Sequence, residues 1–103
     1  NYDLVLDNKR IDVKTKRCNT PPRTYYDCSV SAHGSKQKCD AYVFVRILTD
    51  LSYAWILGEI SKEDFYKKAT RHNRGDLDVD NGYIFKADCY NLKIGELIDV
   101  EEA

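Results

Sequence analysis

Residues 2–17, YDLVLDNKRIDVKTKR, contain two runs in which apolar and polar residues alternate, and the polar run DNKR lies between them. Alternation with a period of two is typical of β-strands with one buried and one exposed face. If Asn8 and Lys9 form a two-residue turn, the two strands pair so that Asp3 lies opposite Lys14. The pattern therefore predicts a β-hairpin at the start of the sequence.

The predicted hairpin has a charged face and an apolar face, because facing residues of paired strands lie on the same side of a sheet. The charged face carries two acids and two lysines: Asp3, Asp12, Lys14 and Lys16. The apolar face carries four aliphatic residues: Leu4, Leu6, Ile11 and Val13. We expect the apolar face to pack against the core.

The remainder of the chain predicts an α+β domain. Four further runs have the character of strands: YYDCSVSA at 25–32, AYVFVRIL at 41–48, YAWILGEI at 53–60 and YIFKADCYNL at 83–92. Residues 61–72 predict a helix with Ser61 as its N-cap, and the consecutive prolines Pro21 and Pro22 predict an irregular link after the hairpin. We expect one domain over residues 1–103, with a mostly antiparallel or mixed central sheet and a flanking helix.

Composition and charge narrow the function classes. With 43% apolar and 32% charged residues, the 103-residue chain has the composition of a folded protein. No apolar run approaches the roughly 20 residues that cross a bilayer, so we expect no membrane partner. Residues 1–46 carry nine Lys or Arg against five Asp, whereas 47–103 carry seven against twelve acids. The basic half, which includes the hairpin, favours a polyanionic partner, although such an imbalance also arises by chance.

The four cysteines are separated by nine, ten and forty-nine residues: Cys18, Cys28, Cys39 and Cys89. Structural zinc sites usually pair their ligands at C-x2–4-C spacing, which the sequence lacks. We therefore expect reduced and mostly buried cysteines. A zinc-stabilised interaction module is the less favoured alternative.

The charged face of the hairpin suggests metal-dependent chemistry on phosphate. Two neighbouring carboxylates repel each other unless a cation lies between them. Mg2+ fits this place because it binds through one or two carboxylates and keeps several waters. A lysine beside the metal can orient the attacking water and stabilise the charge that develops on the phosphoryl group. This arrangement favours hydrolysis of a phosphodiester.

The hairpin resembles the PD-(D/E)XK nuclease superfamily, particularly its small prokaryotic and phage members. The resemblance is carried by Asp3 near the end of one strand and by Asp12-Val13-Lys14 on the next, and the later block DAYVFVRI…AWILGEISKEDFYKKA is also similar. It implies a restriction-endonuclease-like fold. That fold normally begins with a helix and a strand, which we expect upstream of Asn1 in a longer chain or from another chain.

By this resemblance, Asp3, Asp12 and the Val13 carbonyl bind Mg2+ or Mn2+, and Lys14 assists the water. The implied activity is that of a DNA endonuclease in the cytoplasm of a prokaryote or of a phage-infected host cell. Whether the chain acts as a monomer or a homodimer stays open. The alternative is a catalytically incomplete nuclease fold that binds nucleic acid or a protein partner.

Three cations follow the charged face into the proline-containing link: Lys16, Arg17 and Arg23. They predict contacts with backbone phosphates, and a solvated cluster is the equally weighted alternative. Tyr25 and Tyr26 can either stack on bases or pack in the sheet.

Overall fold

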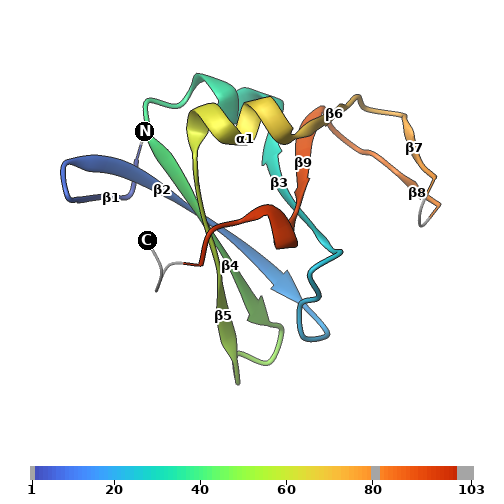
Figure 1. Cartoon of the computed structure of the whole chain (residues 1–103). Coiled ribbons are helices and arrows are strands. Elements are labelled where there is room, and N and C mark those ends of the chain that lie inside the picture. Colours follow the sequence, from blue (N-terminus) through green and yellow to red (C-terminus); the bar gives the residue numbers. More distant parts are fainter. Residues whose placement is uncertain (1, 80–81, 100–103) are drawn as a thin grey trace.

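The structure, a computed structural model, describes residues 2–79 and 82–99 (Figure 1). Its strands are β1 Leu4–Leu6, β2 Lys9–Cys18, β3 Asp27–Ser31, β4 Ala41–Leu48, β5 Ala54–Ser61, β6 Thr70–His72, β7 Leu77–Asp78, β8 Tyr83–Ile84 and β9 Cys89–Lys93. Its helix α1 spans Lys62–Lys68, and two short 3-10 helices, η1 and η2, span Ala32–Lys36 and Ile94–Glu96.

The central sheet is mixed, with strand order β1-β2-β4-β5. β1 and β2 pair antiparallel, β2 and β4 pair parallel, and β4 and β5 pair antiparallel. The prediction of an α+β fold with a mixed sheet and a flanking helix is confirmed. The apolar run at 41–48 forms the interior strand β4, as β-branched and aromatic residues favour.

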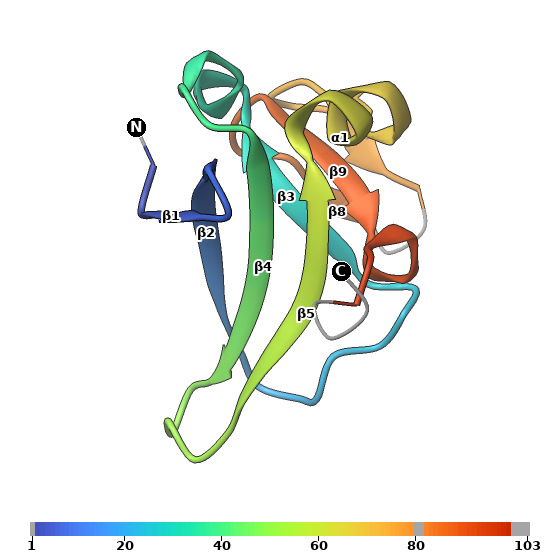
Figure 2. The ribbon, with the colours of Figure 1, turned by 60° about the vertical axis from the view of Figure 1, so that its left-hand side comes forward.

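A second sheet, of order β3-β9-β6, and helix α1 cover one face of the central sheet, and β7 and β8 form a separate hairpin (Figures 1 and 2). The core between these layers includes Tyr42, Phe44, Phe65 and Val30. Tyr42 and Phe65 are fully buried, with their ring centroids 5.4 Å apart. The aromatic side chains of β4 and α1 therefore join the layers.

The main core cluster lies on the charged face of the hairpin, whereas of the four predicted apolar-face residues only Ile11 is buried, at 4% exposed. The prediction that the apolar face packs inward is therefore wrong for Leu4 and Leu6. In the parallel pairing, Asp12 lies beside Tyr42 and Lys14 beside Phe44. Leu4 and Leu6, on the other face, are 43% and 57% exposed. Both faces of β4 are apolar, and the large aromatic rings bury more area than the valines that alternate with them. The sequence of the hairpin alone does not reveal this choice.

The turn of the hairpin is Asp7-Asn8 and not Asn8-Lys9. Both residues have positive φ, 51° and 66°, as in a type I′ turn, and Leu6 pairs with Lys9. Asp and Asn tolerate the left-handed region better than Lys does. The shift changes the register by two residues, so Val5 aligns with Arg10 instead of Asp12, while the faces of the paired side chains are unchanged.

The helix begins as predicted, because the Ser61 hydroxyl accepts a hydrogen bond of 3.1 Å from the Asp64 N–H. It ends at Lys68 and not at His72, since the following residues form β6 beside β9. The predicted strand over 83–92 is divided into β8 and β9. No helix among the described residues is long and apolar enough to cross a membrane.

Gly58 is expected to be needed for the close packing of the Ile98 backbone against β5. Its φ is +144°, and a Cβ there would lie 2.7 Å from the Ile98 carbonyl oxygen, which pairs with Glu59. Gly58→Ala should lower the free energy of unfolding by about 3 kcal/mol, measured by urea titration. Gly75→Ala is the matched control, because Gly75 also has positive φ (+92°) but has nothing within 4 Å. It should cost about 1 kcal/mol. Equal losses would show that the contact with Ile98 is unimportant.

Candidate active site

The structure brings Asp12 and Lys14 into direct contact. Both project from β2 toward the second layer, and Lys14 Nζ lies 2.8 Å from Asp12 Oδ2. Asp12 is only 6% exposed, and the Lys14 side chain is 27% exposed. The site therefore contains a buried carboxylate whose Oδ2 is held against the Lys14 ammonium.

Gln37, at the C-terminal end of η1, connects to both charged groups. Its Oε1 accepts a 2.8 Å hydrogen bond from Lys14 Nζ, and its Nε2 donates a 3.3 Å bond to Asp12 Oδ1. Its backbone carbonyl accepts from Lys62 Nζ at the start of α1. The Lys14 ammonium also lies 5.8 Å from the centre of the Tyr42 ring. These contacts restrict the Lys14 ammonium to one place.

The sequence reasoning missed Gln37, which lies in the polar run HGSKQKCD after the second predicted strand. Nothing in the local sequence distinguishes a single glutamine in a polar loop as a functional residue. Only the return of the chain from β3 to the start of β4 places it over β2.

Asp3 is exposed and lies beside the pair, not within it. Its Oδ2 accepts a 2.7 Å hydrogen bond from the Val13 N–H. The N–H and C=O of one strand residue point to the same strand edge, so the Val13 carbonyl also faces the β1 edge. The structure thus places Asp3 and the Val13 backbone at one edge of β2, next to the residue pair Asp12 and Lys14.

The described residues contain no group of three or more His, Cys, Asp or Glu that could hold a metal ion. A Mg2+ site needs only one or two carboxylates with retained water. Asp12 supplies one buried carboxylate for such a site, and Asp3 supplies a second carboxylate at the adjoining edge. A metal bound here would supply a Lewis acid for a phosphoryl oxygen.

The predicted phosphate-binding residues separate in the structure. Lys16 shares the inward face of β2 with Lys14 and lines a cavity of about 850 Å³. Arg17 projects to the opposite face because side chains alternate along a strand. Arg23 is exposed in the link between β2 and β3. Of the three cations, only Lys16 faces the same side as the pair, and the prediction that they contact phosphates stays a prediction.

All four cysteines are free thiols, as expected, although only Cys28 and Cys39 are fully buried. Cys28 Sγ donates a 3.1 Å hydrogen bond to the Leu92 carbonyl. Burial away from water raises the pKa of this thiol to about 12. The described cysteines belong to different parts of the fold, which gives no support to a zinc-stabilised module.

Comparison of the chain with protein-family models, with curated proteins and with solved structures finds no match.

We expect the Asp12–Lys14 pair to add little net stability, because the attraction between the two charges is offset by the cost of removing them from water. Lys14→Met should lower the free energy of unfolding by about 3 kcal/mol, because it leaves Asp12 as an unpaired buried carboxylate. The double variant Asp12→Leu/Lys14→Met should unfold within about 1 kcal/mol of the parent. Urea titrations of the parent, both single variants and the double variant measure this.

The exposed pair Glu63 and Lys67 on α1, 3.2 Å apart, is the control. The corresponding cycle on that pair should give a coupling of about 0.3–0.5 kcal/mol. If the double variant at Asp12 and Lys14 loses as much stability as the two single variants combined, the two residues are not coupled and the prediction is wrong.

Cys28 is expected to resist alkylation in the folded protein. Because its pKa is about 12, roughly one thiol in ten thousand is ionised at pH 8. Iodoacetamide followed by peptide mass spectrometry should leave Cys28 unmodified in buffer and modified in urea. Because folding raises this pKa above the unfolded value, its contribution to stability is complete below pH 9 and is lost as the pH rises toward 12. Rapid modification at pH 8 without urea would contradict this assignment.

Proposed function

We propose that the chain is a divalent-metal-dependent DNA endonuclease that hydrolyses phosphodiester bonds. The observation that supports this most is the buried Asp12 carboxylate, whose Oδ2 lies 2.8 Å from the Lys14 ammonium. A buried ion pair is a poor way to stabilise a fold. A carboxylate and a lysine held in this way suit a reaction on a phosphate instead.

Each residue has a role in this proposal. Asp12 and Asp3, with the Val13 carbonyl, would hold Mg2+ or Mn2+. When bound, the metal would polarise a phosphoryl oxygen and acidify a water. Lys14 orients the attacking water and stabilises the negative charge on the phosphoryl oxygens. The new bond forms between the water oxygen and phosphorus, and the bond from phosphorus to the leaving oxygen breaks.

The same proposal assigns the sheet β1-β2-β4-β5 to a restriction-endonuclease-like core. Supporting it are the mixed sheet, the acids on β1's N-terminal side and on β2, and the helix that follows β5. Gln37 and the Tyr42 ring hold the Lys14 ammonium in place. Such a lysine loses less conformational entropy when it orients a water than a freely rotating lysine does.

The test is cleavage of supercoiled plasmid in Mg2+ or Mn2+. The parent should convert the plasmid to a nicked form, and EDTA should abolish this. Asp12→Asn and Lys14→Gln should each reduce the rate at least about 100-fold, because each removes a charge that the transition state requires. A linear product would show that both strands are cut, as dimeric nucleases do.

Glu63→Gln and Lys67→Gln remove an acid and a lysine from an exposed pair and should cut like the parent. Circular dichroism verifies that each variant is folded at the assay temperature. Cleavage at the parent rate by both Asp12→Asn and Lys14→Gln would contradict the assignment of this site. A folded parent that cuts no plasmid with either metal, whether alone or extended upstream of Asn1, would leave the nucleic-acid-binding alternative.

A further inference from the structure

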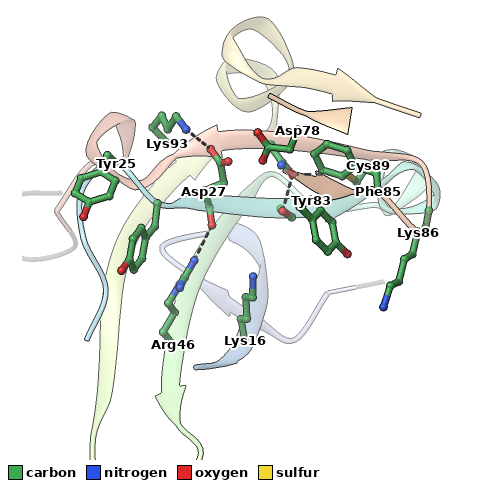
Figure 3. Close-up of a pocket in the computed structure, with 14 residues that line it drawn as sticks. Lys16, Tyr25, Asp27, Arg46, Asp78, Tyr83, Phe85, Lys86, Cys89 and Lys93 are labelled. Atoms are coloured by element: carbon green, nitrogen blue, oxygen red, sulfur yellow. Dashed lines mark hydrogen bonds and ion pairs between the residues drawn. The ribbon is translucent and has the colours of Figure 1, made fainter. Parts of the chain in front are cut away.

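A cavity of about 850 Å³ lies next to the Asp12–Lys14 pair, between the central sheet and the layer formed by β3, β9 and β8 (Figure 3). Lys16 and Arg46 rise from β2 and β4 into it, with Tyr25 and Lys86 at opposite ends. This size suits one or two nucleotide units and is too small for a double helix, whose major groove alone is about 12 Å wide.

The cavity is lined by more positive than negative charge. Four cations and two acids line it: Lys16, Arg46, Lys86, Lys93, Asp27 and Asp78. Lys93 is paired with Asp27 at 3.2 Å, and Arg46 Nη2 donates a 2.8 Å bond to the Asp27 carbonyl. Lys16 and Lys86 form no ion pair with any residue that the structure describes. Two lysines are thus available to an anion in a chain whose net charge is −1.

Aromatic rings line the same cavity. Tyr25 is 67% exposed and meets Tyr26 edge to face, and Tyr83 meets Phe85 in the same manner. The Phe85 ring is in turn stacked on His72, with centroids 4.3 Å apart. The Arg46 guanidinium lies 5.4 Å from the centre of the Tyr26 ring and packs against it. Exposed aromatic rings held by their neighbours suit the stacking of unpaired bases.

The cavity continues toward the proposed reaction site. Lys14 and Lys16 are two residues apart on one face of β2, which is about 7 Å. A smaller cavity of about 60 Å³ is lined by Lys14 and also by four residues that line the larger one: Lys16, Asp27, Ser29 and Arg46. The residues that line both cavities therefore connect Lys14 with the larger cavity that the tyrosines line.

We propose that this cavity binds an unpaired, single-stranded segment of the nucleic acid, so that the enzyme cuts next to single-stranded DNA. The phosphates contact Lys16 and Lys86, and the bases stack on Tyr25 and Tyr83. A base inside a duplex cannot reach these rings, because its faces are covered by its neighbours. The inference rests on the proposed nuclease function for the reaction itself, but the binding that it predicts is measurable without cleavage.

The test is binding of a fluorescein-labelled oligothymidylate, compared with a duplex of equal length, by fluorescence anisotropy in EDTA. The parent should bind the single strand roughly tenfold or more tightly than the duplex. Tyr25→Ala should weaken binding of the single strand roughly 5- to 100-fold. Tyr53→Ala is the matched control, because Tyr53 is also 67% exposed but stacks on Trp55 in the β4–β5 hairpin, and it should bind like the parent.

A second pair of variants tests the charges. Lys86→Ala should reduce the dependence of log affinity on log salt by about one unit, as expected for the loss of one phosphate contact. Lys67→Ala removes an exposed lysine from α1 and should leave that slope unchanged. Equal binding of duplex and single strand, or an affinity that Tyr25→Ala does not change, would overturn the proposal.

The outcomes separate this inference from the proposed function. Asp12-dependent cleavage of plasmid without preferential single-strand binding would overturn the role of the cavity and leave the nuclease assignment standing. Tyr25-dependent binding of the oligothymidylate by a chain that cuts no DNA would support the cavity and overturn the nuclease assignment.

Discussion

The parallel pairing of β2 with β4 determines where the functional groups lie. It aligns Asp12 with Tyr42 and Lys14 with Phe44, so the charged row of β2 runs beside the aromatic row of β4. A parallel pair cannot be joined by a tight turn, and the chain must cross from the end of β2 back to the start of β4. The crossover, residues 19–40, contains β3 and η1. It thereby places Gln37 over the ion pair and β3 over the remainder of the same face.

This arrangement has an energetic cost that the rest of the core must offset. Asp12 is buried, with Lys14 Nζ at its Oδ2 and Gln37 Nε2 at its Oδ1. Removing a carboxylate and an ammonium from water is unfavourable by several kcal/mol for each charge. Tyr42, beside Asp12, and the Phe44 and Phe65 rings that contact Tyr42 provide compensating burial. The aromatic core thus supports the charge pair from the neighbouring strand.

The sequence was sufficient for the features that depend on local pattern. Alternation in the hairpin put Asp12 and Lys14 on one face, and Ser61 marked the start of α1. It was insufficient where two local choices had similar energies. Either pair of turn residues preserved the alternation, and either face of the hairpin could have joined the core. Long-range pairing decided both questions, and it also determined which loop residue, Gln37, would reach the pair.

The two rows of side chains also explain why one face of the sheet changes from core to cavity along its length. On β2 the row runs Asp12, Lys14, Lys16, and on β4 it runs Tyr42, Phe44, Arg46. The third member of each row is a cation, so the aromatic packing stops there. Arg46 is 7% exposed, and its bond to the Asp27 carbonyl holds β3 above the central sheet. Arg46, which follows Tyr42 and Phe44 on the inward face of β4, therefore keeps the layers together next to the cavity.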